Sequence, residues 1–167
     1  MFRDREFVKC VAALGDGRVV TAGGSAWNLH VWDIHTGQKT AFPTSLPYSG
    51  KHCVIVLALA DGRVLSTGAD ADGVVQVWDL TTGQYTTIVT GHHHVIMTMA
   101  ELPDGRVVSG ALFEVTPRVW DPSTGVNSGM NPTTAMGDGN RDMVRSLVVL
   151  PDGRVVSGGV DHVRVWR

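Results

Sequence analysis

Two short motifs each occur four times along this chain of 167 residues. The tripeptide Asp-Gly-Arg begins at intervals of 45, 43 and 48 residues, at Asp16, Asp61, Asp104 and Asp152. The dipeptide Val-Trp ends at intervals of 46, 42 and 46 residues, at Trp32, Trp78, Trp120 and Trp166. Two motifs that recur together four times at similar intervals indicate an internal repeat. Periods of roughly 20–50 residues are typical of solenoids and propellers.

Each repeat has the pattern of a small antiparallel sheet. An apolar run precedes each Asp-Gly, as HCVIVLALA precedes Asp61, which is typical of a strand buried on both faces. Asp and Gly both tolerate the positive φ of a tight hairpin, so the pair is expected to reverse the chain. A second strand, a variable loop and a third strand ending at the Trp follow. No segment has a helical period of useful length, so the sequence predicts an all-β fold.

The blocks TGHHHVIMTMAELPDGRVVSG and VVQVWDLTTGQ resemble the WD repeat, including the pair Gly91–His92 and the terminal Trp-Asp. This resemblance covers nearly the whole chain and implies a WD-repeat β-propeller, in which each repeat forms a four-stranded blade. The predicted fold is therefore a single propeller segment over 1–167, with four blades of antiparallel sheet. The blades are expected at approximately 7–42, 53–89, 94–136 and 143–167.

The resemblance also implies a hydrogen-bonded network in each blade, formed by a His, a Ser or Thr, an Asp and the Trp. This sequence supplies the network incompletely, and Glu114 stands in the third blade where an Asp is expected. The predicted structural residues are Trp32, Trp78, Trp120, Trp166, His92, Asp72, Asp161, Ser109 and Ser157. Because a half-satisfied buried network costs stability, these blades are expected to be less rigid than regular ones.

Four blades are few for this family, which usually has about seven within a propeller range of roughly four to eight. The chain stops at Trp166–Arg167, on a third strand, so the last blade is expected to lack its outer strand. Three explanations stay open. Either the chain is a fragment of a longer propeller and pairs with the remainder of its parent chain, or two copies form a homodimer that completes an eight-bladed ring, or the four blades form a small or incomplete ring alone.

The loops that enter each blade, and those between the second and third strands, differ most among the repeats. Because loops on a shared scaffold carry function, and aromatic and Arg side chains anchor protein recognition, these loops are predicted to bind partners. The predicted partner-binding residues are Trp27, Tyr48, Phe113, Glu114, His93 and Arg141. The alternative interpretation is that these side chains only cover blade edges.

No catalytic, metal-binding or cofactor-binding residue is predicted. Three successive histidines, His92 to His94, point alternately to opposite sides of an extended chain and cannot easily surround one ion. No spacing pairs a nucleophile with a base, and no phosphate-binding Gly-rich loop is present. The predicted function is a non-catalytic scaffold that binds protein or peptide partners. The alternatives are a propeller enzyme or sugar-binding module, and a structural fragment of a longer propeller without a partner of its own.

Composition argues against other partners. The formal net charge is −2 and the basic residues are scattered singly, so nucleic acid is not an expected partner. No stretch approaches the ~20 apolar residues that span a bilayer, and the N-terminal residues have no apolar signal core. Membrane association is therefore not expected, and a cytoplasmic location is the default. Cys10 and Cys53 are too few for a disulfide framework.

Overall fold

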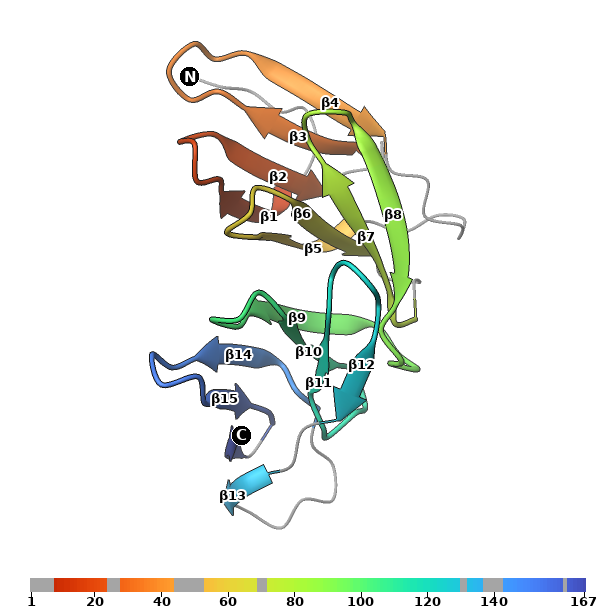
Figure 1. Ribbon diagram of the computed structural model, residues 1–167, viewed down its shortest axis with the longest axis vertical. Coiled ribbons are helices and arrows are strands. Elements are labelled where there is room, and N and C mark those ends of the chain that lie inside the picture. The colour runs from red at the N-terminus through yellow and green to blue at the C-terminus, as the bar shows by residue number, and fades with distance from the viewer. Residues whose placement is uncertain are drawn as a thin grey trace. The chain divides into compact units, whose positions relative to one another are not determined.

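The computed structural model describes residues 8–23, 28–43, 53–68, 72–129, 132–136, 143–160 and 162–167 (Figure 1). Within these ranges the chain forms β-strands and no helix, which confirms the predicted all-β class. The described residues accordingly include no helix of the length and apolarity needed to cross a membrane. The strands make four antiparallel four-stranded sheets. The chain divides into two compact units, residues 1–71 with 75–87 and residues 72–74 with 88–167.

The first unit contains two sheets, although three residues of the second sheet, 74, 88 and 89, belong to the second unit. The first sheet consists of β1 (Val8–Ala13), β2 (Val19–Gly23), β3 (Asn28–Trp32) and β4 (Lys39–Pro43), in that order. The second sheet consists of β5 (Cys53–Ala58), β6 (Val64–Gly68), β7 (Val74–Asp79) and β8 (Gln84–Val89), also in chain order. Consecutive antiparallel strands of this kind form the blade of a propeller.

The second unit also contains two sheets. The third sheet consists of β9 (Ile96–Glu101), β10 (Val107–Ala111), β11 (Arg118–Trp120) and β12 (Asn127–Gly129), again in chain order. The fourth sheet has the order β14 (Ser146–Val149), β15 (Val155–Gly158), β16 (Val163–Trp166) and β13 (Pro132–Met136). Its outer strand β13 therefore comes before its inner strand in the sequence.

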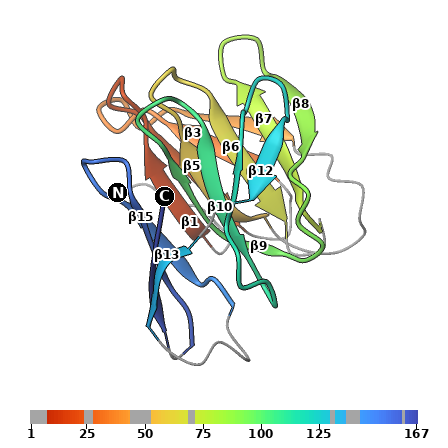
Figure 2. The same cartoon turned by 60° about the horizontal axis from the view of Figure 1, so that its bottom comes forward.

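The expectation that the last blade lacks its outer strand is wrong. β13 pairs antiparallel with β16, with Met136 opposite Val163 and Pro132 opposite Trp166 (Figure 1, Figure 2). The sequence analysis assigned this segment to the third blade, but the three residues of β12 alone form the outer strand there. The physical reason is the edge of β16, whose unpaired N–H and C=O groups accept any extended segment within reach.

The Asp-Gly-Arg segments reverse the chain as predicted, but not through two residues of positive φ. In each described turn only the Gly has positive φ, as in Gly17 at 85° and Gly62 at 90°. The Asp16 carboxylate instead accepts the backbone N–H of Arg18 at 3.0 Å and its Nε–H at 2.7 Å. The same pair of bonds recurs in the other three turns. Because the carboxylate holds the turn, the Asp has no need of the left-handed conformation.

Each sheet has two different faces, because successive residues of a strand point to opposite sides. We call the side that carries the tryptophan the Trp face and the opposite side the Val face. The middle row of the Val face spans three paired strands in every sheet. These rows are Ala12, Val20 and Val31 in the first sheet, Leu57, Leu65 and Val77 in the second, Ala100, Val108 and Val119 in the third, and Val148, Val156 and Val165 in the fourth.

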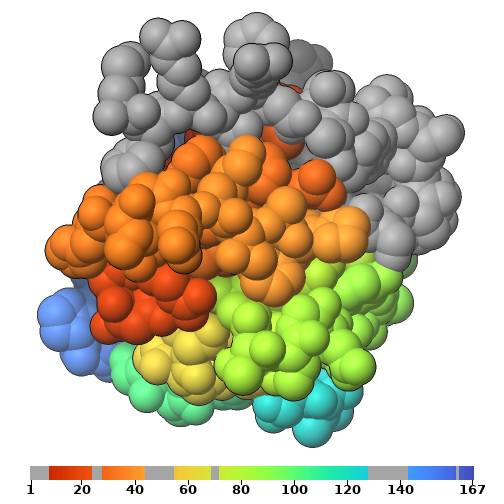
Figure 3. Space-filling view, turned by 90° about the horizontal axis from the view of Figure 1, so that it is seen from above, coloured from red at the N-terminus to blue at the C-terminus, as the bar shows by residue number. Residues whose placement is uncertain are grey.

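Within each unit the Val face of one sheet packs on the Trp face of the next. In the first unit Val20 and Val31 share a buried cluster with Val56 and Trp78 of the second sheet. Phe42 of β4 meets the ring of Trp78 edge-on, with centroids 6.3 Å apart. Figure 3 shows the atoms of β3 and β4 (orange) beside those of β7 and β8 (light green).

In the second unit Val108 and Val119 of the third sheet share a buried cluster with Val155 and Trp166 of the fourth. Both units therefore bury an aliphatic row against a tryptophan. A single sheet with two apolar faces is stable only when neighbours cover it, and large aromatic side chains contribute much of the buried area.

Candidate partner-binding surface

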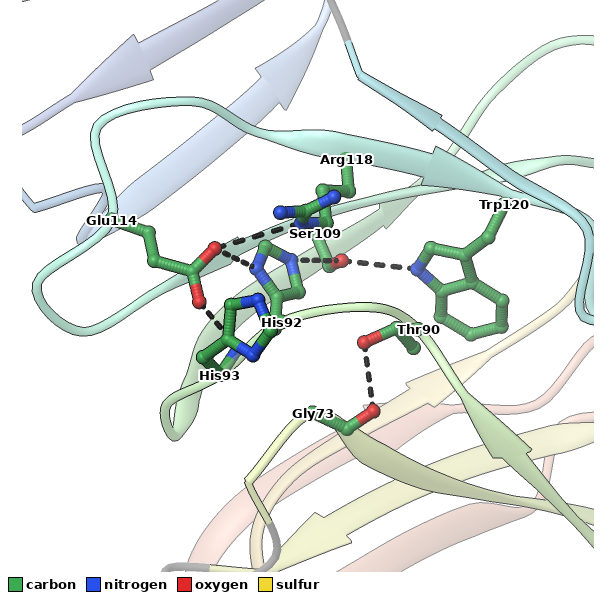
Figure 4. Close-up of polar contacts among 8 residues, drawn as sticks. All are labelled: Gly73, Thr90, His92, His93, Ser109, Glu114, Arg118 and Trp120. Carbon is green, nitrogen blue, oxygen red and sulfur yellow. Dashed lines mark hydrogen bonds and ion pairs between the residues drawn. The ribbon is translucent and has the colours of Figure 1, made fainter.

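A chain of hydrogen bonds runs through the third sheet from a tryptophan to a carboxylate (Figure 4). The indole N–H of Trp120 donates to Ser109 Oγ at 3.0 Å. Ser109 Oγ lies 2.8 Å from His92 Nε2, and His92 Nδ1 lies 2.7 Å from Glu114 Oε2. Glu114 thus completes the network at the position where an Asp was expected.

Donor and acceptor chemistry fixes the direction of these bonds. An indole N–H only donates, and a carboxylate only accepts. The Ser109 hydroxyl therefore accepts from Trp120 and donates to His92 Nε2, while His92 Nδ1–H donates to Glu114. This arrangement satisfies every member with a neutral imidazole.

Burial favours the same protonation state. Burial lowers the pKa of His92 below its ordinary value, and the nearby Glu114 carboxylate, which acts in the opposite direction, does not compensate. Burial raises the pKa of Glu114, but the hydrogen bonds from His92 and from the backbone N–H of His93 outweigh this effect, so the pKa lies below its usual range. The pair is thus a neutral histidine beside an ionised carboxylate.

The same network fixes the two loops that flank it. The backbone N–H of His93 donates to Glu114 Oε1 at 2.7 Å, which joins the loop entering the third sheet to the loop between β10 and β11. Thr90 Oγ1 donates to the carbonyl of Gly73 at 2.8 Å, and the N–H of Gly73 donates to the carbonyl of His94. Both loops are therefore held by hydrogen bonds at several points, and we call the two loops together the platform.

An exposed aromatic side chain stands on this platform. Phe113 is 68% exposed and has a φ of 59°, the one positive value among the described non-glycine residues. Its ring meets that of His94 edge-on, with centroids 5.6 Å apart. His93 and His94 are also exposed. We call His93, His94 and Phe113 the Phe113 patch.

The strained conformation of Phe113 has a local structural cause. The N–H of Glu114 donates to the carbonyl of Ala111, which closes a turn with Phe113 near its centre, and the N–H of Leu112 donates to the carbonyl of Val95. The turn directs the Glu114 carboxylate inwards to His92 and leaves the Phe113 ring in solvent. A non-glycine residue in the left-handed region costs about 1–2 kcal/mol, so this geometry is maintained against a local cost.

The other predicted structural residues fall into three groups. Trp32, Trp78 and Trp166 donate their indole N–H to Thr21, Ser66 and Ser157 at 2.9, 2.9 and 2.8 Å, so all four sheets repeat the bond from Trp to hydroxyl. Asp72 is exposed, so the structure does not place it in a buried network. Asp161 lies outside the described residues.

The predicted partner-binding residues are distributed as follows. His93 and Phe113 lie together in the Phe113 patch. Glu114 lies beside them, but its side chain is only 14% exposed and its oxygens are bonded to His92 and His93. Trp27, Tyr48 and Arg141 lie outside the described residues.

Sequence reasoning missed Arg118, which stands two residues before Trp120. Its Nε lies 3.6 Å from Glu114 Oε2, and its side chain is 30% exposed. The signal for this residue was a charged side chain in an otherwise apolar strand, at a position where the first two repeats have His30 and Gln76. The guanidinium of Arg118 therefore lies beside the ionised Glu114 carboxylate.

The order Ser109, His92, Glu114 matches the connectivity of a hydrolase triad. Ser109 is, however, fully buried, and its oxygen already accepts the indole N–H of Trp120. A nucleophile must reach its substrate, and this hydroxyl has no path to one. Within the described ranges no group of three or more His, Cys, Asp or Glu side chains is placed to hold a metal ion.

Comparison with known proteins shows which ones this chain resembles. No protein-family model matches it. It is 29% identical over 116 residues to the protein groucho of Drosophila melanogaster. The aligned residues make up 69% of this chain and 16% of groucho. It is also 35% identical over 69 residues to an uncharacterized WD repeat-containing protein of Schizosaccharomyces pombe. These aligned residues make up 41% of this chain and 18% of that protein.

Solved structures give the same result for the fold. The WD40 propeller domain of Doa1 matches with a TM-score of 0.69 at 22% identity, covering 99% of this chain and 52% of that one. The WD40 repeats of RRP9 match with a TM-score of 0.77 at 18% identity, covering 98% of this chain and 49% of that one. The chain thus spans about half of these propellers and less than a fifth of groucho.

Proposed function

We propose that this chain, which belongs to the WD-repeat β-propeller family, is a non-catalytic scaffold that binds protein or peptide partners through the Phe113 patch. The observation that carries the proposal is Phe113 itself. A large apolar side chain that is 68% exposed, in a conformation with a local cost, is fixed on loops that are held at several points. Strain of this kind clusters at functional sites.

The chemistry of the patch indicates the kind of partner. Phe113 offers an apolar anchor, and exposed His93 and His94 offer hydrogen-bonding groups beside it. Pre-ordered aromatic anchors give much of the binding energy of protein interfaces, because little side-chain entropy is lost on binding. A peptide with an apolar or aromatic residue would match Phe113, and polar groups beside that residue would match His93 and His94.

Panning of a phage-displayed library of random peptides against the purified chain tests this proposal. We expect enriched peptides whose affinity falls at least tenfold with Phe113→Ala and stays unchanged with Val126→Ala. Val126 is 71% exposed and lies outside the patch, so it is the matched control. Recovery of no specific peptide, or of peptides that bind both variants equally, would count against the proposal.

A second variant separates loss of the side chain from collapse of the loop. Glycine adopts a φ of 59° without strain, so Phe113→Gly is expected to be more stable than Phe113→Ala by about 1 kcal/mol. Both variants should lose peptide binding to the same extent. If Phe113→Gly restored binding, the side chain would not be the anchor.

Three other expectations from the sequence stay predictions. Trp27, Tyr48 and Arg141 stay proposed partner-binding residues, and the cytoplasm is the expected location. The absence of catalysis is proposed on the ground that Ser109 is buried. No observation favours a sugar-binding module over a protein-binding one.

A further inference from the structure

The second sheet has an outer strand without the features that normally protect the edge of a sheet. Proteins protect such edges with charged side chains, with proline, or by keeping the edge strand very short. Among the outer strands of the four sheets, β4 begins with Lys39 and ends with Pro43, β13 begins with Pro132, and β12 has only three residues. β8 has six residues, QYTTIV, and contains neither a charged residue nor a proline. Its edge is therefore suited to pairing with another strand.

One hydrogen bond at the end of β8 shows which backbone groups the strand presents at this edge. The N–H of Thr90, which follows β8, donates to the carbonyl of Gly73, which precedes β7. Because backbone groups alternate in direction along a strand, those of Ile88 also point to β7, and those of Thr87 and Val89 point away from it. β8 is the last strand in the order of its sheet (Figure 1), so no strand of the described residues pairs with it on that side.

Blades added at either end of the series would not cover this edge. The blades of a propeller pack face to face around a central channel, whereas β8 presents its outer edge on the side away from β7. The side chains of Thr86, Thr87 and Val89 are exposed, and that of Val89 is 65% exposed. The partner that fits this edge is therefore an additional strand and not an additional blade.

The sequence of β8 is complementary to itself in the antiparallel direction. A twofold axis beside Thr87 would place this residue opposite Thr87 of a second copy, and the outward N–H and C=O groups of both would bond across the axis. The same register places the exposed Val89 opposite Tyr85 of the second copy, and Thr86 opposite Ile88. Pairs of an aromatic with a β-branched residue, and pairs of two threonines, stabilise antiparallel sheets. No charged side chain lies on the strand, so no like charges meet.

The outer strand of the first sheet lacks this complementarity. The N–H of Asp33 donates to the carbonyl of Gln38, so by the same alternation the backbone groups of Lys39 and Pro43 point outwards. In the corresponding antiparallel register Pro43, which has no N–H, would lie opposite Lys39. The ladder would lose a hydrogen bond at each end, and we therefore expect pairing at β8 and not at β4.

We propose that two copies of this chain associate through β8, so that their second sheets join edge to edge about a twofold axis beside Thr87. Each copy contributes the same strand, so the contact is isologous and closes at two copies. Main-chain hydrogen bonds supply the attraction, as in other complexes in which a strand is added to the edge of a sheet. The contact includes no residue of the Phe113 patch.

Sedimentation equilibrium of the purified chain over a wide range of concentrations tests this association. We expect a reversible equilibrium between a monomer and a dimer. Thr87→Pro removes the outward N–H at the axis, a change that an edge strand tolerates because this N–H does not face the neighbouring strand. Each dimer then loses two hydrogen bonds, so the dissociation constant should rise at least about tenfold.

Charges at the twofold axis give a result that misfolding cannot produce. Thr87→Lys and Thr87→Glu each place two like charges directly opposite one another, so each variant alone should stay monomeric where the native chain is dimeric. An equimolar mixture of the two variants should form a dimer, because opposite charges then meet at the axis. Thr40→Lys and Thr40→Glu change an exposed threonine of β4 and are the matched controls, which should dimerise as the native chain does. Far-ultraviolet circular dichroism of each variant should match that of the native chain.

Several results would overturn the proposal. These are a monomer at every concentration, open oligomers or fibres without a defined dimer, a dimer that is unchanged by Thr87→Pro, and a mixture of the two charged variants that stays monomeric. A monomer at every concentration would leave the edge of β8 to an extended segment of a different protein. The peptide-binding experiment uses the Phe113 patch and not this edge, so either proposal can fail while the other holds.

Discussion

Two buried serines accept the same hydrogen bond from a tryptophan, but they differ in the number of their other hydrogen-bond partners. Ser66 and Ser109 are both fully buried, and each accepts an indole N–H, at 2.9 and 3.0 Å. Ser109 also bonds to His92 Nε2 at 2.8 Å. The third sheet therefore has a continuous chain of bonds from Trp120 to Glu114.

The two serines are expected to respond differently to the same substitution. Ser66→Ala leaves one buried donor without its serine acceptor, whereas Ser109→Ala removes the partner of both an indole N–H and an imidazole nitrogen. An unsatisfied buried group costs about 1–3 kcal/mol, so Ser109→Ala should lower the free energy of unfolding by about that much more than Ser66→Ala. Urea denaturation followed by tryptophan fluorescence measures the difference. Equal losses would show that the bond to His92 contributes nothing.

The buried histidine makes stability depend on pH. The pKa of His92 is lower in the folded chain than in the unfolded chain, chiefly because of burial. The unfolded state therefore binds more protons, and stability falls as the pH drops below the ordinary histidine value of about 6.5. The lowered pKa of Glu114 acts in the same direction, but only below about 4.5, its ordinary value.

Replacement of each histidine by glutamine isolates this effect. Between pH 7 and about 5, the melting temperature of the native chain should fall, and that of His92→Gln should fall less. His93→Gln, which changes an exposed histidine next to it, should behave as the native chain does. If the melting temperature of His92→Gln fell as much as that of the native chain, the pH dependence would come from another residue.

Some of these residue roles followed from the sequence and others did not. The repeated Val-Trp motif and the Gly91–His92 pair predicted the four indoles and the buried histidine, because each belongs to a fixed spacing. The positive φ of Phe113 was not predictable, since it arises from a turn that positions its neighbour Glu114. Glu114 was placed both at the Asp position of the network and among the partner-binding residues, and the structure shows it bonded to His92 in the network.

At the scale of elements, the inner strands were predictable and the outer strands were not. The apolar runs before each Asp-Gly correspond to β1, β5, β9 and β14, because a short apolar run that ends at a turn is a strong strand pattern. The expected burial on both faces is wrong for β1 and β14, neither of which contains a buried residue. The outer strands β4 and β8 are largely exposed and carry no such pattern. The pairing of β13 with β16 is set by the edge that β16 presents, which is a property of the folded sheet.

Two equivalent glycines provide a test of packing between the third and fourth sheets. Gly110 and Gly158 follow the same Val-Val-Ser segment in β10 and β15. A methyl group added to Gly110 would overlap the side chain of Val144, whereas one added to Gly158 would have as its nearest neighbour Ser146 Oγ, at 3.4 Å. Neither glycine has a positive φ, so only the available space differs.

Gly110→Ala is therefore expected to lower the free energy of unfolding by about 1–3 kcal/mol, the usual cost of overpacking a filled core. Gly158→Ala should change it by no more than about 0.5 kcal/mol. Chemical denaturation of the two variants under the same conditions gives the comparison. If Gly110→Ala left the free energy of unfolding unchanged, Val144 would have to move aside freely, and the segment before β14 would not be tightly packed.

At the scale of the whole molecule, the fourfold repeat determines how the sheets pack within each unit. In both units a Val face is buried on the Trp face of the next sheet, and a small sheet of this kind is stable only when neighbours cover it. The sequence showed that the repeats must cover one another, but not which side chains form the contact. The strand register and the buried clusters identify them as Val20 and Val31 against Trp78 in the first unit, and Val108 and Val119 against Trp166 in the second.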